Sequence, residues 1–178
     1  MKDGEELNMI KIEKALVTDA SEIMALIQHV HDNMENQQWY VIDSAEYYAH
    51  HLEDGKGVGY KSVDTETGKI VGIFIAIIPE TVESNLGYDI GFSEAKAKKA
   101  AVMDTAAILP EYRGRNFQYR MMQAAEHDLK EQGYQYLLCT VHPENRFSLH
   151  NVQKQGYEIM ITKEKYGGFL RHILLKEI

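Results

Sequence analysis

The sequence has little cysteine, little proline and a deficit of positive charge, and no apolar run approaches the roughly 20 residues that a bilayer requires. A single cysteine, Cys139, cannot form an internal disulfide, which excludes a disulfide-stabilised fold and favours a reducing compartment. The prolines Pro79, Pro110 and Pro143 each follow an apolar run, so they are expected at strand ends. No proline-rich or serine-rich linker divides the chain.

Charge and the N-terminal composition restrict the partners further. The formal net charge is −8, from 27 acidic and 19 basic residues, which argues against general nucleic-acid binding. The N-terminal stretch "MKDGEELNMIK" is acidic and polar and lacks the apolar core of a secretory signal. We therefore expect a cytoplasmic protein with no nucleic-acid or membrane partner.

The apolar pattern predicts a tail at residues 1–8 and one α/β domain at residues 9–178. The domain is expected to hold one central mixed sheet flanked by helices, in the order β-α-α-β-β-β-α-β-α-β-β. Strands are expected at residues 9–16, 57–64, 68–78, 101–109, 135–141, 157–164 and 169–178. Helices are expected at residues 18–34, 44–53, 117–132 and 145–156, with residues 79–99 left unassigned.

The corner after the fourth strand, "LPEYRGRNFQYR", combines a strand end, a glycine and a helix start. Pro110 cannot continue a central ladder, and Gly114 allows a positive φ. The first N–H groups of the helix that begins near Asn116 or Phe117 have no partner within it, so they favour an anion. With Arg113 or Arg115 they would form a phosphate site. The alternative, a plain helix start with surface arginines, stays open at this point.

Two segments resemble the GCN5-related N-acetyltransferase (GNAT) superfamily. "AAILPEYRGRNFQYRMM" is similar to the family's strand, R/Q-x-x-G-x-G/A motif and helix, and "LLCTVHPENRFSLHNVQKQGYE" is similar to its next strand and helix. The resemblance extends from residue 9 to the C-terminus. It implies a GNAT-like fold and acetyl-CoA as the acyl donor, with direct transfer of the acetyl group to an amine.

The resemblance also implies which residues contact the cofactor. Arg113 and Gly114 match the start of the motif, whereas Asn116 and Gln118 replace its later small residues. Asn tolerates left-handed backbone, so Asn116 is a mild replacement. The resemblance implies that the coenzyme A arm is contacted by Ala107, Ile108, Leu109 and Asn145. It implies that the pyrophosphate is contacted by the loop residues Arg115, Asn116, Phe117, Gln118, Tyr119 and Arg120. Asn145 also fits a plain helix N-cap.

The family pattern assigns only some of the catalytic groups. The backbone N–H of Ile108 is the expected oxyanion donor. The tyrosine that often acts as the acid in this family falls on Val152, which cannot donate a proton. The remaining sources are His142, Tyr166 and solvent, and solvent is favoured because a coenzyme A thiolate is a tolerable leaving group. Cys139 is interpreted as core, and no histidine spacing predicts a metal site.

Other polar and aromatic residues have two interpretations. Asp104 and Thr140 either face the cleft or belong to a polar outer face. Trp39, Tyr40 and Tyr166 either hold an amine by cation–π contact or simply pack. The expected partner is a small-molecule or peptide amine, and a homodimer is left open. The alternatives to N-acetylation are O-acylation, a longer acyl donor, and a catalytically silent acetyl-CoA-binding sensor.

Overall fold

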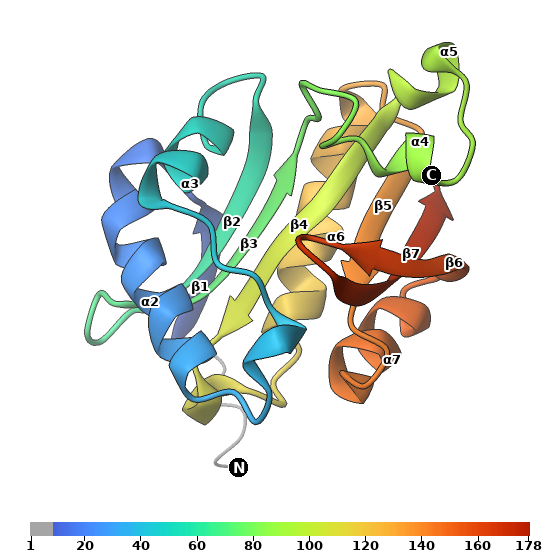
Figure 1. Ribbon diagram of the computed structural model, residues 1–178. Coiled ribbons are helices and arrows are strands. Elements are labelled where there is room, and N and C mark those ends of the chain that lie inside the picture. Colours follow the sequence, from blue (N-terminus) through green and yellow to red (C-terminus); the bar gives the residue numbers. More distant parts are fainter. Residues whose placement is uncertain (1–8) are drawn as a thin grey trace.

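The computed structural model describes residues 9–178 as a seven-stranded mixed sheet between two layers of helices (Figure 1). The predicted tail at residues 1–8 lies outside the described residues. The strands are β1 (Ile10–Lys14), β2 (Gly57–Asp64), β3 (Ile70–Ile77), β4 (Ala100–Ile108), β5 (Tyr136–Val141), β6 (Glu158–Lys165) and β7 (Phe169–Glu177). Their order across the sheet is β1-β2-β3-β4-β5-β7-β6.

The helices vary from single turns to four turns. The α-helices are α2 (Ala20–Asp32), α3 (Ala45–His51), α4 (Leu86–Asp89), α5 (Glu94–Ala97), α6 (Phe117–Glu131) and α7 (Arg146–Lys154). Three 3₁₀ turns are also present, η1 (Val17–Asp19), η2 (Gln37–Trp39) and η3 (Pro110–Tyr112). In Figure 1, α2 and α3 lie on the near face of the sheet and α6 lies behind it.

The sheet separates two apolar clusters, one against each helical layer. On β3, Ile73 and Ile75 pack in the cluster of α2 and α3, while Phe74 and Ala76 pack in the cluster of α6. Every residue of β3 is buried. Coverage of both faces explains why this strand is a continuous apolar run rather than an alternating one.

The predicted fold class and the order of its main elements are confirmed by the structure. The unassigned residues 79–99 contain α4 and α5, each of four residues, which are too short to show a helical period in the sequence. Asp19 directly precedes α2, but its side chain does not cap the helix. Its carboxylate instead accepts the Leu16 N–H (2.7 Å) and so stabilises the preceding turn.

The parallel strands β4 and β5 pair only at their beginnings. Their register is Ala100↔Tyr136, Ala101↔Leu137 and Val102↔Leu138. Residues 103–108 of β4 and 139–141 of β5 have no register partners in each other, so the strands diverge. On its other side β4 stays paired with β3 and bulges between Met103 and Thr105, which leaves Asp104 as the extra residue. The divergence opens a gap in the middle of the sheet.

Candidate functional site

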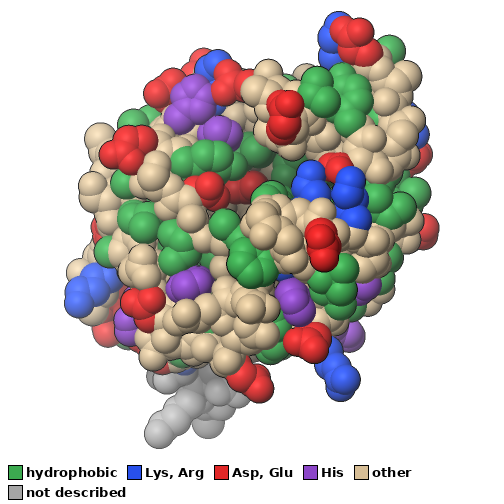
Figure 2. Space-filling model, in the orientation of Figure 1, with side chains coloured by type: hydrophobic (Ala, Val, Ile, Leu, Met, Phe, Trp, Pro, Cys, Tyr) green, Lys and Arg blue, Asp and Glu red, His purple; other side chains and the backbone are tan. Residues whose placement is uncertain are grey.

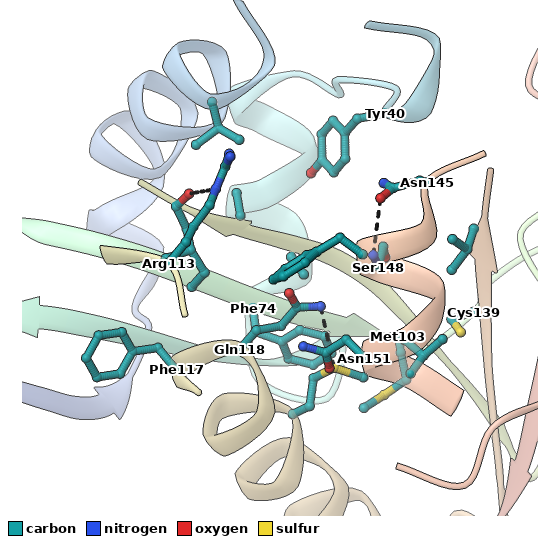
Figure 3. A pocket seen from close by; sticks show the side chains of 18 of the residues that line it. Tyr40, Phe74, Met103, Arg113, Phe117, Gln118, Cys139, Asn145, Ser148 and Asn151 are labelled. Carbon is teal, nitrogen blue, oxygen red and sulfur yellow. Dashed lines mark hydrogen bonds between the residues drawn. The ribbon is translucent and has the colours of Figure 1, made fainter. Parts of the chain in front are cut away.

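The gap between β4 and β5 holds a cavity of about 360 Å³, which we call the first cavity. Its lining includes Met34 from the α2 side of the sheet, and Phe74 and Met122 from the α6 side. In Figure 3, Tyr40 approaches the cavity from one side, and Gln118 and Asn151 approach it from the other. The first cavity therefore passes through the sheet.

The backbone of β4 presents alternate peptide groups to this gap. The Leu109 N–H donates to the Val71 carbonyl (2.9 Å), so it faces β3. In an antiparallel ladder the peptide groups of alternate residues point in opposite directions, so those of Ala106 and Ile108 face the gap. The Ile108 carbonyl accepts from Arg113 Nε (3.3 Å), as this alternation requires. Ile108 and Ala106 can thus offer N–H donors, whereas Leu109 cannot.

The corner after β4 has the backbone conformation expected of an anion site. Gly114 has φ 77°, and Asn116, the residue before α6, has φ 61°. The left-handed conformation expected at Asn116 is confirmed. The Asn116 side chain makes no capping hydrogen bond, and the first turn of α6 contains no acidic residue. The N–H groups at the start of α6 therefore remain available to an anionic ligand.

Most of the residues assigned to the cofactor line the first cavity. They are Ala107, Ile108, Arg113, Gly114, Arg115, Asn116, Phe117, Gln118 and Asn145. Leu109, Tyr119 and Arg120 are not in its lining, and Tyr119 is 41% exposed. The predicted N-cap role of Asn145 is confirmed, because its Oδ1 accepts the Ser148 N–H (3.1 Å) while the residue lines the cavity (Figure 3).

A second cavity of about 260 Å³ adjoins the first. Both are lined by Trp39, Tyr40, Asp104 and Thr140, so they meet at the β4 bulge. In Figure 2, acidic side chains gather at a hollow in the middle of the near face of the molecule. The arrangement answers an open question from the sequence: Asp104 and Thr140 face the cleft.

Asp104 is partly buried at this junction. Burial raises the pKa of its carboxyl to about 6, and the nearby Asp43 carboxylate raises it too, whereas hydrogen bonds from the side chains of Thr105 and Tyr47 lower it. The Thr105 hydroxyl donates to Asp104 Oδ2 (2.9 Å). A carboxylate with a pKa near 6 can accept a proton from an ammonium group near neutral pH. The sequence left open whether Asp104 faces the cleft, because the alternation of side chains along a strand does not reveal where a bulge occurs.

The two predicted acid candidates lie in different surroundings. Tyr166 lines the second cavity, and its hydroxyl lies 3.3 Å from Thr140 Oγ1. Burial raises the Tyr166 pKa, so the hydroxyl keeps its proton. His142 lines neither cavity, and its Nδ1 accepts the Glu144 N–H (3.2 Å). Val152 is buried in the wall of the first cavity, where it offers no proton.

Cys139 also lines the first cavity, but its thiol is unreactive. Burial raises its pKa to about 12, so it is not a thiolate at neutral pH. Within residues 9–178, no group of three or more histidine, cysteine or acidic residues is arranged to hold a metal ion. In the same part of the chain, no helix has the length and apolarity needed to cross a membrane.

Three solved structures share the fold at low sequence identity. The Streptococcus pneumoniae GNAT acetyltransferase superposes with a TM-score of 0.72 at 17% identity, covering 95% of this chain and 99% of that one. The ribosomal-protein-S18-alanine N-acetyltransferase of Escherichia coli gives 0.68 at 14% identity, covering 96% and 94%. The Salmonella typhimurium protein yncA, solved with its cofactor acetyl-CoA, gives 0.68 at 13%, covering 94% and 93%.

The sequence itself carries the family assignment. No curated protein matches the chain significantly. Residues 17–157, however, match the sequence profile of the Acetyltransferase (GNAT) family, and this span includes the β4–α6 corner, the β5–α7 segment and most of both cavity walls. The chain therefore belongs to the GNAT acetyltransferase family.

Proposed function

We propose that the protein is an acetyl-CoA-dependent N-acetyltransferase that acts on an amine by direct transfer. The observation that carries the proposal is the first cavity, which crosses the sheet from the start of α6 to Asp104. One end offers uncapped helix N–H groups suited to a pyrophosphate, and the other end offers the partly buried Asp104 carboxylate, which suits an amine. The two requirements of the reaction thus lie at opposite ends of one channel.

The residues of the first cavity fit coenzyme A. The pyrophosphate would lie against the backbone of Arg115, Asn116 and Phe117. The peptide groups of Ala106 and Ile108, which face the gap, would pair with the extended arm as an added strand does. Arg113 and Asn145 would flank the two sides of this arm. When bound, acetyl-CoA supplies the thioester whose acetyl group is transferred.

Groups at the junction have three tasks in this reaction. Asp104 removes a proton from the acceptor ammonium, so that the neutral amine can form the new C–N bond. The Ala106 N–H, nearer to Asp104 along the strand than Ile108, donates to the carbonyl oxygen as it gains negative charge. Tyr166 would give a proton to the sulfur as the C–S bond breaks and would regain one from the nitrogen, which loses its second proton as the amide forms. Asp104 would release the first proton to solvent. Thr140, close to the Tyr166 hydroxyl, orients it.

Binding and turnover should be measured separately. Titration calorimetry with coenzyme A tests the first cavity, and release of free thiol from acetyl-CoA with a panel of amines tests the reaction. Binding with thiol release and an N-acetylated product is the expected result. Binding without thiol release on any amine would indicate a sensor of the same fold, and absence of binding would remove coenzyme A from this cavity.

A further inference from the structure

The second cavity has an acidic end at the β4 bulge. Asp104 lies there, and the Asp43 carboxylate is close enough to raise its pKa electrostatically. Asp43 is half-buried, and burial raises its own pKa. Two carboxylates that share a partly dry space repel each other, so a cation between them relieves the cost. This end of the second cavity suits an ammonium group.

The lining of the second cavity also includes a buried guanidinium. Arg171 is only 2% exposed, and it donates from Nη1 to the Leu170 carbonyl (2.8 Å) and from Nη2 to the Gln38 carbonyl (2.7 Å). Within residues 9–178, no carboxylate lies at ion-pair distance from it. A guanidinium has five N–H donors, and buried charges are usually paired with an opposite charge. The rings of Tyr166 (5.9 Å) and Phe169 (5.7 Å) also lie near the Arg171 guanidinium, but these contacts and the two carbonyls leave its charge without a carboxylate among the described residues and part of its donor set unmatched.

The same lining offers a second donor. The bond from Arg171 to Gln38 ties η2 to β7, which places Trp39 beside this part of the second cavity. The indole Nε1 of Trp39 is buried, and the described residues provide it with no hydrogen-bond partner. A buried donor without an acceptor is unfavourable, so an acceptor atom is expected there. Lys163 and Lys165, in contrast, are both matched by Asp89.

Tyr166 connects the two ends. Its ring lies 5.9 Å from the Arg171 guanidinium, and Asp104 acts electrostatically on its hydroxyl. An occupant that reaches from Asp104 to Arg171 passes this ring. A volume of about 260 Å³ suits a small molecule rather than a folded partner.

We infer that the acceptor is a small amine that also carries a carboxylate, such as a free amino acid. Its ammonium group lies at Asp104 and Asp43, and its carboxylate accepts from Arg171 and Trp39. The inference rests on the proposed function and narrows its substrate. It explains why, among residues 9–178, the lining of one cavity holds two carboxylates without a cationic partner and a guanidinium without a carboxylate.

Matched pairs of acceptors test the inference on the wild-type protein. Phenylalanine is compared with 2-phenylethylamine, and lysine with cadaverine, because each pair differs only in the carboxylate. Phenylalanine methyl ester keeps the shape of phenylalanine but lacks the negative charge of its carboxylate. We expect kcat/KM, from thiol release, to be at least about 10²-fold higher for the amino acids. An equal or higher value for the decarboxylated amines, or for a peptide N-terminus, overturns the inference but leaves the proposed function standing.

Variants of the second cavity show where the carboxylate of the acceptor binds. Arg171→Gln and Trp39→Phe should each reduce the preference for phenylalanine over 2-phenylethylamine by about tenfold or more, and Lys163→Gln should leave it unchanged. The ratio is diagnostic, because a purely structural role of Arg171 would lower both rates together. If Arg171→Gln does not fold, Trp39→Phe and the wild-type pairs decide. If no acceptor is turned over, calorimetry of phenylalanine against 2-phenylethylamine in the presence of coenzyme A decides, since equal affinity overturns the inference.

Discussion

The two cavities are built from different kinds of structure. The first cavity has one continuous segment in its wall, the end of β4 and the start of α6, and much of the chemistry of that segment is backbone N–H. The second cavity takes single side chains from η2, α3, β4 and β7, which are far apart in sequence, and its chemistry is side-chain charge. A backbone-built site tolerates substitution of most side chains, whereas a side-chain-built site does not.

The comparison predicts different sensitivities for the two cavities. Changes in the second cavity should reduce kcat and alter acceptor choice while leaving coenzyme A binding intact. Changes in the corner should alter coenzyme A affinity through backbone strain. The following substitutions test this division.

The largest effect is expected at Asp104. Asp104→Asn keeps the shape but removes the proton acceptor, and it should lower kcat by about 10³-fold with unchanged coenzyme A affinity by calorimetry. In the wild type, kcat/KM should fall tenfold per pH unit below about 6, where the Asp104 carboxylate becomes protonated. A pH profile flat from 5 to 8 would contradict the role.

The pH dependence of folding stability provides an independent control for Asp104→Asn. Burial raises the Asp104 pKa above its value in the unfolded chain, so the protein loses stability as the pH rises through about 6. Asp104→Asn removes this loss. The variant should therefore be at least as stable as the wild type at pH 7.5 in thermal denaturation, and a loss of activity there cannot come from unfolding.

The next effect distinguishes the two acid candidates. Tyr166→Phe removes the hydroxyl in the second cavity, and it should lower kcat by about 10²-fold with little change in coenzyme A affinity. His142→Gln is the matched control, because His142 lines neither cavity, and it should leave kcat within about threefold. Small effects in both variants would assign the proton to solvent, as the sequence favoured, and a loss confined to His142→Gln would reverse the assignment.

A smaller effect is expected at the corner. Gly114 has φ 77°, and a β-branched residue there is strained by about 1–2 kcal/mol, so Gly114→Val should weaken coenzyme A binding by about tenfold. Gly68→Val is a suitable control, since Gly68 has φ 70° in the β2–β3 turn, away from both cavities. It should cost similar stability without changing the affinity. Equal losses of affinity in both variants would mean that the corner does not hold the cofactor.

The smallest effect is expected at Cys139. Cys139→Ala should leave kcat within about threefold, because the thiol is buried and protonated and direct transfer requires no acyl-enzyme. Mass spectrometry after incubation with acetyl-CoA alone should find Cys139 unmodified. Detection of an acetylated Cys139 would show that the first cavity uses a covalent step.

The sequence by itself determined the strands of the sheet, its main helices and the β4–α6 corner. These features depend on local order: apolar period, Pro110 at a strand end, Gly114 and Asn116 before a helix. Only the tertiary structure decided that Asp104 is the extra residue of a bulge, that the peptide groups of Ala106 and Ile108 face the gap, and that His142 lies outside both cavities. Strand divergence, the position of the bulge and the presence of Asp104, Arg171 and Trp39 in the lining of one cavity depend on register and packing between distant segments, which no local pattern records.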